Sequence, residues 1–219
     1  MKEYDFKNEL TEWLQFFKEC GVNEFDVSIE RRCKEDLYSE LVVQIDDCTK
    51  CDLHINRKNI VIGDGNLDSK VMFIGEAPGE EEDNKGLPFV GRAGQLLTKM
   101  LVSINLKRED VYIANIVKCR PPNNRVPLPL EVQKCYPYLD MQIDIIRPRL
   151  IVTLGAPATQ TLLKTKQSIS QMRGRFYKYE KNIRIFPTFH PAFLLRNPNK
   201  KREAWEDLKV ISKFLSENE

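Results

Sequence analysis

Apolar residues form four short runs along the chain, and each run stops at turn-forming or polar residues. The runs are Val71–Ile74, Val111–Val117, Leu150–Gly155 and Ile183–His190. They are nearly continuous rather than alternating, which is typical of β-strands that are covered on both faces. We therefore predict four buried strands.

Segments with helical periodicity separate and follow these strands. Apolar residues recur every three or four positions over residues 96–104, from about Leu130, from Ala156 to Leu163, and over residues 200–216. Strands that alternate with helices favour a parallel sheet with helices on both faces. The pattern thus predicts an α/β fold with a central, mostly parallel, four-stranded sheet flanked by helices.

The first part of the chain has a different pattern. Residues 5–20 and 35–46 each place apolar side chains on one helical face, and no strand lies near them. We therefore predict an N-terminal helical extension at residues 1–45, followed by the α/β domain at residues 46–219.

Charge is unevenly distributed over the 219 residues. Residues 1–50 carry 7 basic and 13 acidic residues, whereas the remainder carries 27 basic and 19 acidic residues. A basic body suits a polyanionic partner such as nucleic acid. No apolar run approaches the roughly 18 residues needed to cross a bilayer, and the polar start does not resemble a signal peptide. We expect a cytoplasmic protein without a membrane partner.

Unusual residues follow three of the predicted strands. Gly75 opens a Gly-Glu-Ala-Pro-Gly loop that runs into four carboxylates, Asn115 lies in the second strand, and His190 ends the fourth. The carboxyl ends of parallel strands meet at one edge of a sheet, so these residues can converge. With Phe89 from the loop at 84–94, they would form a pocket for a planar polar ligand. Each also has a structural explanation: an acidic helix start, a buried amide, a core histidine or a core phenylalanine.

Six cysteines in a reducing compartment suggest metal or redox chemistry before disulfides. Cys48 and Cys51 form a C-x-x-C pair, and two further cysteines, Cys119 and Cys135, enclose 15 residues. This wide second pair fits a cubane iron–sulfur cluster better than zinc, which more often uses two C-x-x-C pairs. We take Cys20 and Cys33 as buried or inert thiols and His54 as a surface histidine.

Several motifs, in this order, resemble the family 4 uracil-DNA glycosylases. They are Gly75–Asp83, Gly86–Leu97, Asn115–Pro122, Leu154–Ala156 and His190–Arg196. The resemblance runs from about Cys48 to the C-terminus. It implies a three-layer sandwich, a 4Fe–4S cluster on the four cysteines Cys48, Cys51, Cys119 and Cys135, and a monomeric DNA repair enzyme. Such an enzyme flips deoxyuridine out of single- or double-stranded DNA and hydrolyses its N-glycosidic bond.

The resemblance also implies roles around the uracil ring. Phe89 would stack on the base, Asn115 would pair with uracil O4 and N3, and His190 would donate to O2. Backbone N–H groups of the first loop would add donors for the departing anion. That loop comprises Gly75, Glu76 and Ala77.

Further roles lie around the pocket. Glu82 would lie beside uracil C5, where it would disfavour thymine or position water, and Asn124 would assist the leaving group or the water. Leu194 would be the wedge that fills the vacated stack. Arg196 and Arg125 would contact phosphates.

Two features affect the expected mechanism. Ala77 occupies the position where related glycosylase families have a catalytic Asp or Asn, so catalysis must depend on His190, on Glu76 or Glu82, and on the substrate phosphates. A sister group of this family binds uracil-DNA covalently through a histidine in a loop inserted after the first motif. Residues 83–89 contain neither a histidine nor an insertion, which favours an enzyme that turns over rather than one that stays covalently bound to its substrate. The alternatives are a non-catalytic iron–sulfur protein that binds DNA or senses redox state, and a zinc-stabilised DNA-binding domain.

Overall fold

The computed structural model describes residues 6–21 and 33–217, and the chain divides into two compact units, Met1–Arg32 and Cys33–Glu219. The first unit contains α1 (Phe6–Glu19), which agrees with the helix predicted at 5–20. In α1, Trp13 and Phe16 are exposed to solvent.

The second unit begins earlier than the sequence predicted. Its first helix is α2 (Lys34–Asp46), which we had assigned to the extension. Leu41 and Ile45 of α2 are buried in the same core cluster as α5 (Pro129–Ile146). The boundary near residue 45 is therefore wrong, because α2 contributes to the core of the body and the extension ends at Arg32.

The sheet has the strand order β1-β3-β2-β4-β6-β5 in the described part of the chain. Its four inner strands are parallel and confirm the prediction: β2 (Val71–Gly75), β3 (Tyr112–Asn115), β4 (Leu150–Leu154) and β6 (Arg184–Thr188). The edge strands β1 (Asp64–Gly65) and β5 (Tyr177–Lys178) are antiparallel and were not predicted. Strands of two residues are too short to carry a hydrophobic period.

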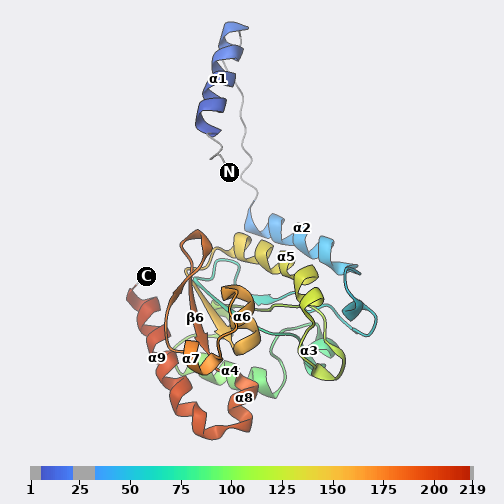
Figure 1. The fold of residues 1–219 in the computed structure, drawn as a ribbon, viewed down its shortest axis with the longest axis vertical. Helices are drawn as coiled ribbons and strands as arrows, with labels where there is room; N and C mark the ends of the chain where they lie inside the picture. The colour runs from blue at the N-terminus through green and yellow to red at the C-terminus, as the bar shows by residue number, and fades with distance from the viewer. Residues whose placement is uncertain (1–5, 22–32, 218–219) are drawn as a thin grey trace. The chain divides into compact units, whose positions relative to one another are not determined.

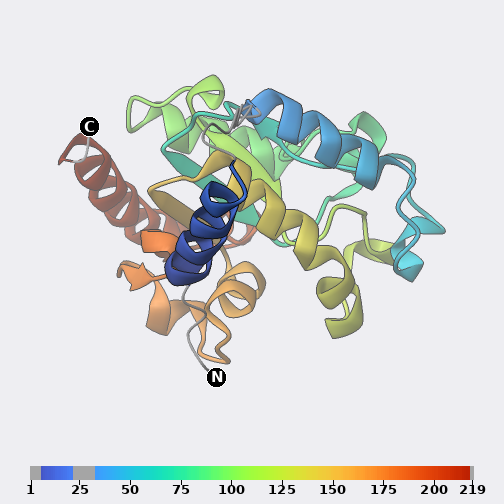
Figure 2. The same cartoon turned by 90° about the horizontal axis from the view of Figure 1, so that it is seen from above.

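Helices cover both faces of the sheet and form three layers (Figure 1). Met72 and Ile74 of β2 face the core that contains α2, α5 and α6 (Ala156–Leu163). Val71 and Phe73 face the opposite core, which α4 (Arg92–Val102), α8 (Pro191–Arg196) and α9 (Lys201–Glu217) complete. Figure 2 shows these layers from above. The short helices α3 (Glu80–Lys85) and α7 (Ile169–Met172) lie in the connections.

The parallel register brings the carboxyl ends of the strands to one edge of the sheet. Gly75 lies opposite Asn115, and Leu154 lies opposite Thr188, two residues before His190. The predicted site residues thus start from neighbouring positions on one edge.

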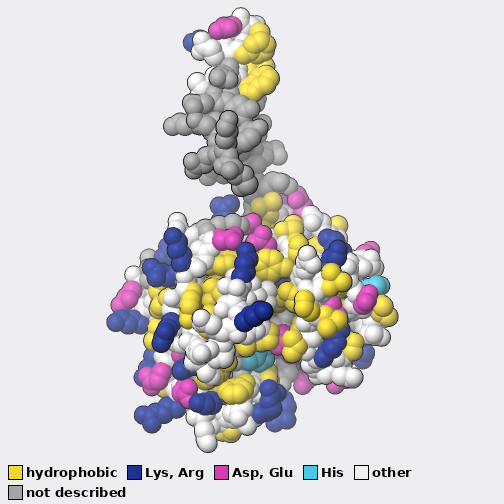
Figure 3. All heavy atoms as spheres, in the orientation of Figure 1, with side chains coloured by type: hydrophobic (Ala, Val, Ile, Leu, Met, Phe, Trp, Pro, Cys, Tyr) yellow, Lys and Arg dark blue, Asp and Glu magenta, His cyan; other side chains and the backbone are white. Residues whose placement is uncertain are grey.

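The surface of the body is mixed in character. Figure 3 shows Lys and Arg side chains distributed over its visible face, with hydrophobic side chains between them. Among the described helices, none has both the length and the apolar character needed to span a membrane.

Candidate active site

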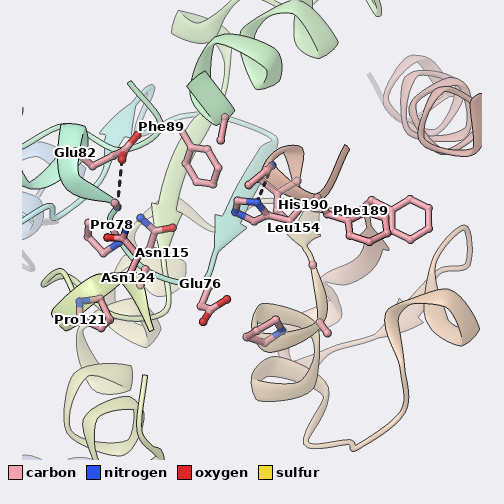
Figure 4. Close-up of a pocket in the computed structure, with 18 of the residues that line it drawn as sticks. Glu76, Pro78, Glu82, Phe89, Asn115, Pro121, Asn124, Leu154, Phe189 and His190 are labelled. Carbon is pink, nitrogen blue, oxygen red and sulfur yellow. Dashed lines mark hydrogen bonds between the residues drawn. The ribbon is translucent and has the colours of Figure 1, made fainter. Parts of the chain in front are cut away.

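A cavity of about 490 Å³ lies at this edge of the sheet, and we call it the strand-end pocket (Figure 4). Segments that follow β2, β3, β4 and β6 all contribute to its wall. Most of the predicted site residues border it: Glu76, Ala77, Glu82, Phe89, Asn115, Asn124, Arg125, His190 and Arg196. The structure therefore brings together residues that are more than 100 positions apart in the sequence.

Asn115 is the most unusual polar group in this wall. The residue is buried, with 1 % of its surface exposed. Among the described residues, its Oδ1 is the only buried side-chain nitrogen or oxygen without a hydrogen-bond partner. An unsatisfied buried acceptor costs about 1–3 kcal/mol. A ligand that donates a hydrogen bond would remove that cost.

Gly75 lies beneath the pocket and allows this arrangement. A Cβ at position 75 would come within 2.5 Å of Asn115 Oδ1 and 2.6 Å of Phe89 Cζ. No side chain fits there unless one of the two residues shifts. Gly75 therefore acts by leaving space and does not itself border the cavity.

Phe89 and His190 both border the pocket, and their rings lie beside each other (Figure 4). Their ring centroids are 5.6 Å apart and their planes are inclined by 34°. Phe89 is buried, with 6 % of its surface exposed, and adopts a positive φ of 52°. The ring thus borders the pocket from a fixed position beside the imidazole.

The protonation state of His190 follows from its contacts. His190 caps the N-terminus of α8, and the backbone N–H of Ala192 donates to its Nδ1 at 3.1 Å. The proton of the neutral ring is therefore on Nε2. Burial, assisted by Arg196 and opposed by Glu82, lowers the pKa of His190 to about 4. At neutral pH the ring is an uncharged donor.

The two glutamates of the first motif that we predicted to be catalytic, Glu76 and Glu82, have different environments. Glu82 accepts hydrogen bonds from the backbone N–H groups of Gly79, Val90 and Gly91 at 2.8–3.1 Å. Its oxygens therefore hold the loop that carries Phe89. Glu76 is half-buried, and its carboxylate makes no hydrogen bond or ion pair with any described residue, although its backbone carbonyl accepts from the N–H of Val117 at 3.2 Å. Burial raises the pKa of this carboxyl group.

Two further residues of the predicted site, Arg125 for a phosphate and Asn124 for the leaving group or water, already have protein partners. Arg125 makes a bidentate pair with buried Glu131, at 2.6 and 2.8 Å. Asn124 is exposed at the mouth of the pocket, and its Oδ1 accepts from Arg120 Nε at 2.8 Å. Arg196 is exposed at the end of α8 and borders the pocket. Of the two arginines, Arg196 is the better placed for a phosphate.

The prediction that Leu194 is a wedge is wrong for this structure. Leu194 is 1 % exposed and packs in the core beneath α8, whereas its neighbour Leu195 is 37 % exposed. Consecutive residues on a helix point about 100° apart. The sequence Leu-Leu does not say which of the two faces the solvent.

The four predicted cysteine ligands border one small cavity, which we call the cysteine cavity: Cys48, Cys51, Cys119 and Cys135. None of them forms a disulfide. The other two cysteines, Cys20 and Cys33, are exposed, so the buried alternative of our expectation is wrong, and that they are inert stays a prediction. The four convergent thiols come from the segment after α2, the loop after β3, and α5.

Donors and positive charge surround these thiols. Arg57 donates from Nη1 to the carbonyl of Cys48 at 2.6 Å and to Cys119 Sγ at 3.5 Å. The backbone N–H of Lys118 donates to Cys135 Sγ at 3.3 Å. These contacts suit sulfurs that carry negative charge.

Four thiols that border one cavity are candidate ligands of a metal centre. No three Cys, His, Asp or Glu side chains in the described ranges are close enough to hold one metal ion. Tetrahedral zinc would place its sulfurs about 3.8 Å apart, whereas a cubane holds each sulfur on a separate iron. Burial raises the pKa of Cys51, Cys119 and Cys135, the last to about 11. The positive charge of a metal centre would favour the thiolate form of these cysteines, so the donor set suits such a centre.

Comparison with known proteins assigns the family. Residues 62–209 match the model of the uracil DNA glycosylase superfamily. The chain belongs to this superfamily. It is 47 % identical to the type-4 uracil-DNA glycosylase of Thermotoga maritima over 83 % of this chain and 96 % of that protein. The corresponding values for the type-4 enzyme of Archaeoglobus fulgidus are 46 %, 82 % and 94 %. A type-5 enzyme of Pyrobaculum aerophilum is less similar, at 32 % over 67 % of this chain.

Sequence reasoning missed three residues around the sites of this superfamily member. Arg57 and His54 border the cysteine cavity, and His54 Nδ1 lies 2.8 Å from the carbonyl oxygen of Cys51. Leu195 is the exposed leucine of α8. The two basic residues soon after the C-x-x-C pair were an available signal, whereas no sequence signal separated Leu195 from Leu194.

Proposed function

We propose that this chain is a uracil-DNA glycosylase of DNA repair that hydrolyses the N-glycosidic bond of a flipped deoxyuridine and leaves an abasic site. The unsatisfied Oδ1 of Asn115 in the strand-end pocket is the observation that carries this proposal. The type-4 relatives bear the name of this activity.

Asn115 provides base selectivity. Its Oδ1 accepts from N3–H of uracil, and its amide nitrogen donates to O4. Cytosine has an acceptor at N3 and a donor at C4, so it presents the opposite pattern. The buried amide would leave groups unpaired against cytosine, and this is how a polar site rejects a wrong ligand.

Phe89 and His190 act on the rest of the ring. Phe89 stacks on the flipped base, a contact worth about 1–3 kcal/mol and tolerant of base identity. His190 donates from Nε2 to uracil O2 as negative charge develops on the leaving base. A neutral donor that is fixed in place before the reaction stabilises that charge without reorganisation. Backbone N–H groups at Glu76 and Ala77 add to it.

Water activation falls to Glu76 in this proposal. Ala77 offers no side-chain acceptor, and the carboxylate of Glu82 is occupied by three backbone donors. Glu76 borders the pocket and its carboxylate has no partner among the described residues, so the carboxylate oxygens are free to orient water toward the sugar. The negatively charged phosphates of the substrate also stabilise the positive charge that develops on the sugar.

DNA contacts come from α8 and the loops beside the pocket. Arg196 binds a phosphate, Leu195 enters the space that the flipped nucleotide leaves, and Asn124 lies at the mouth of the pocket. Arg125 acts mainly through Glu131, because this pair holds the loop between β3 and α5 in place.

We further propose that the four cysteines hold a 4Fe–4S cluster. When it is bound, the cluster joins the segment after α2, the loop after β3 and α5, and Arg57 and Lys118 balance its charge. Its role is structural, because the thiols belong to a separate cavity. A monomeric state and a cytoplasmic location remain predictions from the sequence.

A single-turnover assay on an oligonucleotide with one central uracil tests the proposal. Wild type should release free uracil and leave alkali-sensitive DNA, with no release of cytosine or thymine. Asn115→Asp keeps the shape but loses the donor to O4, and should be at least about 100-fold slower. His190→Gln should lose roughly 100- to 1,000-fold.

Asn182→Asp is the matched control. It makes the same chemical change at an exposed position before β6, at the opposite end of that strand from His190, and should react like wild type. An inactive wild type with a full complement of iron would overturn the catalytic proposal in favour of an iron–sulfur DNA-binding protein. An Asn115→Asp variant as fast as wild type would remove Asn115 from recognition.

A further inference from the structure

The backbone that carries Phe89 is held in a conformation that few side-chain-bearing residues adopt. Its φ of 52° lies in the left-handed region, which is sparsely populated by large residues and persists only when neighbours fix it. Gly94 approaches so closely that a Cβ there would lie 1.8 Å from the carbonyl oxygen of Phe89. The ring is therefore presented by a turn that would relax if its supports were removed.

Two side chains, those of Glu82 and Arg108, hold this turn through hydrogen bonds to its backbone. Glu82 holds the two amides that follow Phe89. Arg108 holds the two carbonyls at the turn itself, with Nη1 donating to Phe89 O at 3.0 Å and Nη2 donating to Pro88 O. The two nitrogens of a planar guanidinium suit two successive carbonyls, whereas a lysine ammonium does not reproduce this fork.

Arg108 is itself anchored to the edge of the sheet. It opens the short helical turn Arg108–Asp110 that leads into β3. Its Nε lies 3.5 Å from an oxygen of Asp64, which is in the edge strand β1 paired with β3. The guanidinium thus connects the loop of Phe89 to the sheet that carries Asn115.

We propose that Arg108 is a positioning residue for base stacking, which sets the place of the Phe89 ring relative to Asn115. This inference rests on the proposed function. Arg108 does not border the strand-end pocket, so it acts through Phe89 and touches neither the base nor the sugar. Without the fork, the Pro88–Phe89 turn relaxes toward extended backbone and the ring leaves the stacking position.

The test is a double-mutant cycle in single-turnover uracil release with Arg108→Met, Phe89→Ala and the double variant. Arg108→Met should lower the maximal rate about 5- to 100-fold, the range of one lost stacking contact. The double variant should be no slower than Phe89→Ala alone, because Arg108 then has no ring to position. The affinity for an undamaged duplex of the same sequence should stay within twofold of wild type.

Two further variants distinguish the two carbonyl hydrogen bonds of Arg108 from the effect of its positive charge. Arg108→Lys keeps the charge and should recover only a minor part of the lost rate. Asp64→Asn removes the ion pair but leaves both carbonyl bonds, and should stay within about threefold of wild type. If Arg108→Met fails to fold, Arg108→Lys takes its place in the cycle.

The possible outcomes are distinct. A wild-type rate for Arg108→Met, or additive losses in the double variant, would overturn the positioning role. A wild type that releases no uracil would instead overturn the proposed function on which the inference rests. Iron content and thermal unfolding, measured on each variant, show whether a slow variant has lost its fold.

Discussion

The strand-end pocket and the cysteine cavity share one short segment, residues 115–119, with Asn115 in the wall of the pocket and Cys119 in the wall of the cavity. Asn115 faces the pocket with an acceptor that no described residue satisfies. Cys119 faces the cavity with its sulfur beside the guanidinium of Arg57. Lys118, between them, donates from Nζ to the carbonyl of Asn115 at 2.8 Å and from its backbone to Cys135 Sγ.

The two sites suit different kinds of ligand. The strand-end pocket suits a ligand that binds and leaves, whereas the cysteine cavity suits a ligand that stays bound. In the pocket, the groups that would meet a base are fixed by their backbones while their hydrogen-bonding atoms stay available. In the cavity, the protein supplies donors to the sulfurs in advance, and buried thiols remain protonated until a metal centre displaces the protons. Changes in the pocket should therefore affect activity, and changes in the cavity should affect stability.

Removal of one cluster ligand should give the largest effect. Cys135→Ser should abolish the visible absorbance and most of the bound iron. It should also lower the free energy of unfolding by several kcal/mol, because metal binding contributes directly to folding. Cys20→Ser, at an exposed cysteine, is the control and should match wild type in iron and stability. Full iron content in Cys135→Ser, or zinc in place of iron in wild type, would contradict the cluster assignment.

The two leucines of α8 should differ in the same way: a change at Leu194 should affect stability, and a change at Leu195 should affect activity. Leu194→Ala should cost about 2–5 kcal/mol of unfolding free energy, because it leaves a cavity in the core. Leu195→Ala should stay within about 0.5 kcal/mol of wild type but react several-fold more slowly on duplex uracil, with little change on single strands. Urea unfolding and single-turnover rates on both substrates measure these effects. The reverse assignment of stability and activity would restore Leu194 as the wedge.

The smallest predicted effect is a loss of stability at low pH that arises from His190 in the strand-end pocket. His190 has a pKa of about 4 in the folded chain against an ordinary value of 6.5. Between these values the unfolded chain binds the proton and the folded chain does not, so stability is lost as the pH falls. From pH 7 to pH 5 the loss should be about 2 kcal/mol.

The measurement compares urea unfolding of wild type and His190→Gln at both pH values, with iron content checked at each. The variant should lack this part of the loss, while carboxyl groups that titrate in both proteins cancel. Equal losses in the two proteins would show that the His190 ring is not kept neutral by the fold.

Much of the site could be predicted from the sequence because its pattern is local. The apolar runs located the four inner strands, and the rule that parallel strands share a carboxyl edge brought Gly75, Asn115 and His190 together. The cysteine spacing grouped four thiols at one cavity. The edge strands and the place of α2 were not predictable in this way, since short strands lack a period and the packing of α2 depends on α5.

The sequence alone determined which chemical groups lie at the edge of the sheet, because hydrophobic burial and chain direction place strand ends without reference to distant contacts. Only the tertiary structure decided what each group is free to do. It buried Leu194 and exposed Leu195, paired Arg125 with Glu131, and bound the oxygens of Glu82 to three backbone amides. It also placed Arg108 behind Phe89. Each of these outcomes depends on the direction of a side chain and on partners from other segments, which periodicity along the chain does not encode.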